Sequence, residues 1–111
     1  MIAGAASVSC VVRRGRITSV SDTSREVSGF PPERYLGRLV FDVIHADDRP
    51  LIMRYFAVGW TGEIDVVVRL EDADGSWTWR RVRGSRTIDA SGEPTASLTL
   101  QKVELPDAAS R

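Results

Sequence analysis

The hydrophobic pattern after Gly59 most constrains the fold, because it changes to a period of two residues. Every second residue from Ile64 to Leu70 is aliphatic, which is typical of a strand with one buried face. Two further strand-like segments follow, and a turn sequence that contains Asp and Gly stands before each of them. The pattern predicts a three-stranded antiparallel meander, with strands at about 64–70, 77–88 and 94–103.

The part of the chain before Gly59 predicts two short strands and then short helices. Segments 8–14 and 17–20 are the strands, joined by a tight turn at Arg14-Gly15-Arg16. Asp22 or Thr23 can cap a first helix with a side-chain oxygen, and Pro31-Pro32 can begin a second.

A third helix is expected from Asp47 or Asp48 to about Val58. The two carboxylates can accept the free amide hydrogens of its first turn. Its buried face is predicted to carry Leu51, Ile52, Tyr55 and Phe56.

This order of elements predicts an α+β domain, with helices packed on one antiparallel sheet. A length of 111 residues fits one domain. We expect the domain at 8–105, an N-terminal tail or short helix at 1–7, and a C-terminal tail or linker at 106–111.

Charge and cysteine content exclude several classes of function. Fifteen Lys and Arg balance fifteen Asp and Glu, so the basic excess that nonspecific nucleic-acid binding needs is missing. The apolar runs are far shorter than the roughly 20 residues of a spanning helix, so no membrane insertion is expected. The single cysteine, Cys10, and the lack of a signal sequence favour a cytoplasmic protein. Lys102 is the only lysine, a bias typical of GC-rich bacterial genomes.

Three segments together resemble the Per-Arnt-Sim (PAS) family of sensor domains. ITSVSDTSREVSGFPPERYLGRLVFDVIHADDR is similar to the PAS run of strand, short helices and His-Pro-Asp-Asp-Arg box. VVVRLEDADGSWTWRRVRG resembles the PAS hairpin with an aromatic-x-Trp strand, and IDASGEP resembles the hairpin before the last strand. The resemblance implies a five-stranded antiparallel sheet with short helices packed on one face. It also implies a sensory or interaction role and pairing through the outer face of the sheet.

Two departures from the family pattern affect this expectation. Ala46 replaces the usual proline after His45, which removes a rigid helix start. The last strand ends in Gln101-Lys102-Val103-Glu104, where many members carry an Asp-Ile-Thr exit motif. The route by which a signal leaves the domain is therefore not indicated by the sequence.

No catalytic or metal site is predicted. The only histidine, His45, has no nucleophile motif nearby, and we expect it to hydrogen-bond the turn at the mouth of the third helix. One His, one Cys and scattered carboxylates offer no metal-ligand spacing. The clustered arginines 80, 81, 83 and 86 alternate between two faces, and we expect them on solvated sheet surface, paired across strands with acidic residues.

The strand position of the tryptophans leaves two alternatives. Trp77 and Trp79 share one face, which is either the core, where a planar ligand could stack, or the outer face, where they would mark a subunit contact. We favour the contact, and predict a homodimer interface that includes Ile2, Val8, Trp77 and Trp79.

A pocket between sheet and helices is the candidate ligand site. Its predicted lining is apolar and could take a small apolar ligand: Phe41, Ile44, Ile52, Phe56, Val66, Val68, Leu98 and Leu100. The sequence supports neither haem nor covalently bound flavin, because the corresponding family motifs are missing, and the cofactor stays unknown.

The predicted function is therefore a non-enzymatic sensory or interaction module of a bacterial signalling protein. It would regulate an attached output domain by binding a small ligand or by rearranging a dimer. The alternative is a small NTF2-like α+β enzyme, an isomerase or cyclase with a cone-shaped pocket. That alternative needs two carboxylates buried together in the pocket.

Overall fold

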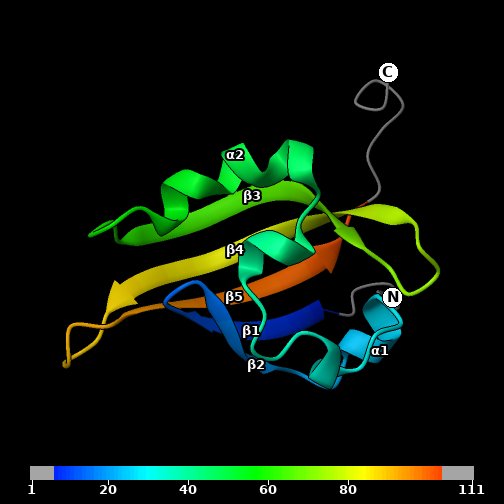
Figure 1. The fold of residues 1–111 in the computed structure, drawn as a ribbon, viewed down its shortest axis with the longest axis horizontal. Coiled ribbons are helices and arrows are strands. Elements are labelled where there is room, and N and C mark those ends of the chain that lie inside the picture. Colours follow the sequence, from blue (N-terminus) through cyan, green and yellow to red (C-terminus); the bar gives the residue numbers. More distant parts are fainter. Residues whose placement is uncertain (1–6, 104–111) are drawn as a thin grey trace, which may run out of the picture.

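The strands form one antiparallel sheet in the order β2-β1-β5-β4-β3, with short helical elements on one face (Figure 1). The computed structural model describes residues 7–103. The strands are β1 (Ser7–Arg13), β2 (Arg16–Val20), β3 (Gly62–Glu71), β4 (Trp77–Ile88) and β5 (Pro94–Lys102). The fold class predicted from the sequence, an α+β PAS-like fold, is confirmed.

The N-terminal hairpin has the tight turn that its sequence indicated. Arg14 and Gly15 both have positive φ, 53° and 80°. Two successive positive φ angles define a type I′ turn, whose twist matches that of antiparallel strands. β1 pairs with β2 on one side and, along its whole length, with β5 on the other, so the hairpin joins the meander through the centre of the sheet.

The meander of β3, β4 and β5 brings the alternating aliphatic residues into cross-strand rows. Val66 pairs with Val82, and Val82 pairs with Leu100. At Gly84 of β4, an added Cβ would lie 1.9 Å from the Ser97 carbonyl oxygen of β5. Only glycine fits at this position of the sheet.

The helical elements are all short and cover the face that carries these rows. They are α1 (Ser24–Val27), η1 (Pro32–Arg34), η2 (Val40–Val43), η3 (Ala46–Asp48), α2 (Arg49–Met53) and η4 (Arg54–Phe56), where η marks a 3₁₀ turn. On this face, α1 contacts β1 and α2 contacts β3, so the two helices lie toward opposite edges of the sheet (Figure 1). Ile52 and Tyr55 pack with Val68 and Leu98 in one buried cluster.

Helix capping differs from the prediction at both expected sites. Thr23 precedes α1 without a side-chain cap, and its hydroxyl donates to the Ser7 carbonyl of β1 instead. Asp48 does not cap α2 either, because its carboxylate accepts hydrogen bonds from Arg69 of β3. The predicted role of His45 at the turn is confirmed, since its Nδ1 accepts the Asp47 amide hydrogen at 3.1 Å.

The third helix is shorter and more broken than the spacing indicated. The segment divides into η3, α2 and η4 and ends at Phe56, after which Ala57 is extended. Ile52 and Tyr55 are buried as predicted, but Leu51, also predicted on the buried face, is 51% exposed, because it lies about 100° around the helix from Ile52.

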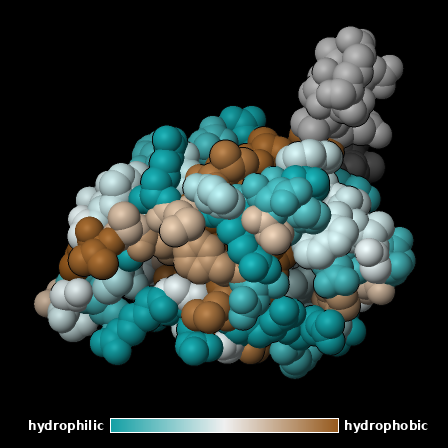
Figure 2. Space-filling view, turned by 45° about the horizontal axis from the view of Figure 1, so that its top comes forward, coloured by the Kyte–Doolittle hydropathy of each residue, from teal (hydrophilic) through white to brown (hydrophobic). Residues whose placement is uncertain are grey.

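Three apolar residues near this segment, Leu51, Met53 and Val58, are exposed. Figure 2 shows hydrophobic groups separated by hydrophilic side chains on the face that it draws. Within residues 7–103, no helix is long and apolar enough to cross a bilayer.

Candidate functional site

A cavity of about 70 Å³ lies between the inner face of the sheet and the helical elements. Six of the eight residues predicted for the pocket line it. They are Ile44, Ile52, Phe56, Val66, Leu98 and Leu100. The helical segment 44–56 and the meander thus supply opposite walls of one space.

Two predicted pocket residues lie elsewhere. Val68 is fully buried but belongs to the core beside the cavity, not to its wall. Phe41 packs edge-on against Phe56, with ring centroids 5.8 Å apart, and is also outside the lining. Phe41 therefore supports a wall residue from behind.

The cavity also has walls from β1, β2 and α1, which were not predicted from the sequence. Val8 and Cys10 of β1 and Ile17 of β2 line the cavity. Val8, predicted for the dimer interface, is 9% exposed and faces the cavity, so it is not available on the outer face of the sheet. The alternation of Val8, Cys10 and Val12 carries this signal, because every second residue of a strand shares a face.

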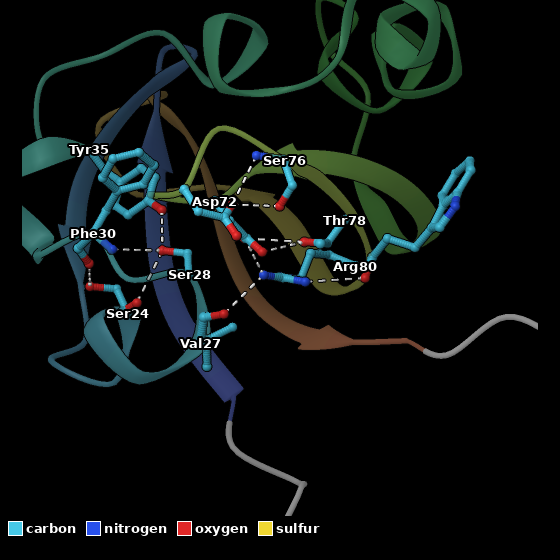
Figure 3. A network of polar contacts seen from close by, with 11 residues as sticks. Ser24, Val27, Ser28, Phe30, Tyr35, Asp72, Ser76, Thr78 and Arg80 are labelled. Carbon is cyan, nitrogen blue, oxygen red and sulfur yellow. Dashed lines mark hydrogen bonds and ion pairs between the residues drawn. The ribbon is translucent and has the colours of Figure 1, made fainter.

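One end of the cavity is closed by a polar cluster around Arg80, drawn in Figure 3. Arg80 Nη2 donates to Asp72 Oδ1 at 2.6 Å and to the Val27 carbonyl at 3.0 Å. Thr78 Oγ1 also donates to the Asp72 carboxylate, at 3.1 Å. The ion pair thereby ties the end of α1 to the β3–β4 turn.

A chain of hydroxyl groups continues this cluster along the α1 side (Figure 3). Ser24 Oγ donates to the Phe30 carbonyl at 2.9 Å, and Ser28 Oγ donates to the Ser24 carbonyl at 3.1 Å. Tyr35 Oη lies 2.6 Å from Ser28 Oγ. Because the Ser28 hydrogen is already used, Tyr35 is the donor of that bond.

The prediction that all four clustered arginines lie on solvated surface is wrong for two of them. Arg80 is 2% exposed and Arg86 is 7% exposed, both on the face that carries Val82. Arg86 Nη1 donates to the carbonyls of Ala57 and Trp60, at 2.8 and 2.7 Å. The inner face accepts these charges because backbone carbonyls and Asp72 provide partners.

The other two arginines behave as predicted. Arg81 and Arg83 are exposed on the outer face. Arg81 forms two hydrogen bonds with Asp65 of β3, at 2.9 and 2.8 Å. This pair is the cross-strand ion pair that the alternation indicated.

Burial keeps the Cys10 thiol and the Tyr35 phenol of the cavity wall uncharged. Desolvation raises the pKa of the Cys10 thiol to about 12. Desolvation also raises the pKa of Tyr35, although its hydrogen bond with Ser28 acts in the opposite direction. Both side chains are therefore neutral at physiological pH.

Within the described residues 7–103, the wall of the cavity contains no carboxylate and no imidazole. Asp48, a buried carboxylate, lies outside it and is bonded to Arg69, whose hydrogen bonds hold the Asp48 pKa below its ordinary value. Across the same described residues, no cluster of three or more His, Cys, Asp or Glu side chains could hold a metal ion.

The outer face carries the two tryptophans of β4. Trp77 is 42% exposed and packs edge-on against His45, with ring centroids 4.8 Å apart. Trp79 lies under the Arg69 guanidinium, 4.9 Å from its ring centroid. Of the two alternatives, the structure therefore has the outward orientation. Ile2, the remaining predicted contact residue, lies outside the described residues.

Comparison with known proteins identifies the family. The family model described as the PAS fold matches residues 17–99, so this chain belongs to the PAS-fold family. PAS domains are typically sensory or interaction modules and are usually not catalytic. A comparison with curated protein sequences gave no match.

A solved structure agrees with this fold. The chain is similar to the PAS-B domain of Cycle from Drosophila melanogaster, in a tryptophan-to-alanine variant with bound glycerol. The TM-score is 0.76 at 15% sequence identity, and the match covers 86% of this chain and 99% of the other. At this identity the similarity defines the fold alone.

Proposed function

We propose that this PAS domain is a sensory or interaction module of a bacterial, cytoplasmic signal-transduction protein. It would regulate an attached output domain by binding a small molecule or by changing dimer geometry. The observation that supports this proposal best is the cavity of about 70 Å³, walled by both the sheet and the helical elements. A ligand there can favour one arrangement of the two layers only through different affinity for the two arrangements.

The alternative of an NTF2-like enzyme has less support. It requires two carboxylates buried together in the pocket, and among the described residues the cavity wall has none. Asp72 reaches the cluster at one end but is neutralised by Arg80. A non-enzymatic domain fits these contacts better.

The ligand-sensing mode is tested by filling the cavity in the full-length protein. Val66→Phe places a larger ring at the cavity wall, and Leu51→Phe places the same ring on an exposed position of α2, away from both the cavity and the outer face of the sheet. We expect Val66→Phe to change the output activity and its response to cell extract, and Leu51→Phe to leave both unchanged. Equal outputs from wild type and folded Val66→Phe would contradict ligand sensing.

The dimer mode rests on the outer face of the sheet. Trp77 is the most exposed aromatic residue there, and Trp79 lies beside it under Arg69. Exposed aromatic area is unfavourable in water, at about 25 cal/mol per Å², and a second copy around a two-fold axis would cover it.

Sedimentation of the purified domain tests the dimer. Trp77→Ala or Trp79→Ala should weaken association by roughly 2 kcal/mol or more without unfolding the domain. Leu51→Ala is the control, because Leu51 is a similarly exposed apolar residue on α2. A monomer at high micromolar concentration, or equal weakening by the control, would exclude this interface.

A further inference from the structure

The cavity wall is almost entirely carbon, although six polar side chains contribute to it. These are Cys10, Ser24, Ser28, Tyr35, Tyr55 and Arg80. What they can offer a ligand depends on how many of their hydrogen-bonding groups are still free.

The hydroxyl hydrogens of the wall are all used inside the protein. Ser24 donates to Phe30, Ser28 donates to Ser24, and Tyr35 donates to Ser28. At the opposite end, Tyr55 Oη donates to the Asp65 carbonyl at 3.3 Å. A ligand acceptor would therefore find no free hydroxyl donor.

The charged group of the wall is directed at protein partners. Arg80 Nη2 donates to the Asp72 carboxylate and to the Val27 carbonyl, and Nη1 donates to the Trp79 carbonyl at 3.4 Å. The Cys10 thiol is a weak hydrogen-bond partner and is held neutral by burial. In the described part of the chain, Thr95 Oγ1 is the one buried side-chain polar atom without a partner, and Thr95 does not line the cavity.

The volume sets an upper limit on the occupant. About 70 Å³ is roughly half of the ~150 Å³ of a dry apolar cavity that binds benzene or xenon. Four carbon atoms in a compact arrangement are a reasonable upper size.

We propose that the cavity binds an uncharged, compact molecule without a hydrogen-bonding group, from the size of a xenon atom to that of isobutane, and discriminates against alcohols and carboxylates of the same shape. This inference rests on the ligand-sensing form of the proposed function and specifies its ligand class. An alcohol entering the cavity gives up its hydrogen bonds to water and meets a wall that is almost entirely carbon and offers no free hydroxyl donor.

The test compares two molecules of the same shape on the purified 111-residue chain. Isobutane and 2-propanol differ by one methyl group in place of a hydroxyl, and xenon serves as a spherical third probe. Methyl NMR shifts of Val66 and Leu98, both in the cavity wall, report binding. We expect saturable shifts with xenon and isobutane, and binding of 2-propanol at least ~10-fold weaker than that of isobutane.

Two variants link the shifts to the cavity. Val66→Phe should abolish them and Val67→Phe should keep them, because only the first ring enters the cavity. Leu98→Ala enlarges the same space and should allow benzene to bind. If Val66→Phe does not fold, the comparison of isobutane with 2-propanol on the wild-type chain still tests whether the cavity discriminates against a hydroxyl group.

Equal or tighter binding of 2-propanol, or no saturable shift with any probe, would overturn the inference. A polar molecule retained through purification and displaced from the cavity would overturn it as well, but would leave the sensory function standing. The sensory function itself fails by a different result, an output that does not respond to folded Val66→Phe.

Discussion

Asp72→Ala should destabilise the domain far more than an ordinary loss of one ion pair. Arg80 is 2% exposed and Asp72 lies 2.6 Å away, so removing the carboxylate leaves a buried guanidinium without its counter-charge. Breaking a buried pair in this way costs about 3–5 kcal/mol. The Val27 and Trp79 carbonyls still accept hydrogen bonds from Arg80, which places the expected loss near ~3 kcal/mol.

Denaturation in urea, followed by circular dichroism, measures this loss. Asp65→Ala is the matched control, because it also removes an aspartate that bonds an arginine of β4, but both groups of that pair are about half exposed. The control should change the unfolding midpoint little, since solvent screens exposed pairs. The double variant Asp72→Ala/Arg80→Met should recover most of the stability, because it removes the unpaired charge and leaves an apolar side chain.

Two results would refute this reasoning. A loss below about 1 kcal/mol for Asp72→Ala would mean that Arg80 reaches water by a small movement. A double variant less stable than Asp72→Ala alone would mean that the hydrogen bonds from Arg80 to the Val27 and Trp79 carbonyls stabilise the fold by more than the unpaired charge destabilises it.

Three further predictions concern acid stability, sheet packing and thiol reactivity. The hydrogen bonds from Arg69 lower the Asp48 pKa in the folded state, so their stabilisation is present above the ordinary aspartate pKa, about 3.9, and is lost as pH falls toward the folded value. Asp48→Asn should therefore flatten the decline of the unfolding midpoint below about pH 4, whereas Asp47→Asn should not. Gly84→Ala should cost at least about 2 kcal/mol, because its Cβ would overlap the Ser97 carbonyl, and Ser85→Ala is the exposed control; equal melting temperatures would contradict the contact. Iodoacetamide should label Cys10 much more slowly in the native protein than in urea, because burial raises the thiol pKa to about 12, and equal rates by mass spectrometry would exclude this.

Periodicity made the strands predictable, because each strand has one buried and one exposed face. Ile64 to Leu70 and the Asp-Gly turns are strictly local signals, and the structure places β3, β4 and β5 where they indicated. The same signal predicted most of the meander side of the cavity, including Val66 and Leu98.

The parts that could not be predicted depend on contacts between distant segments. Arg80 resembles a surface residue in sequence, and its burial requires Asp72 and the Val27 carbonyl, which lies 53 positions away. Asp48 looks like a helix cap until Arg69, 21 positions later, is placed beside it. Polar residues that are satisfied by distant partners leave no local pattern, so sequence reasoning assigns them to solvent.

The pairing of β1 with β5 determines how the domain responds to mechanical load. Ser7 lies opposite Gln101, so the first described strand begins beside the point where the last one ends. Tension applied between these two points would open the antiparallel ladder one hydrogen bond at a time, as in a zipper, and would not shear all its bonds together. A rotation applied there would instead act on the pairing of β1 with β5. These two strands carry Val8 and Leu100 of the cavity wall. The fold thus resists pulling poorly at the Ser7–Gln101 end of the sheet. Rotation at the same end is transmitted to the cavity wall through one pair of strands, β1 and β5.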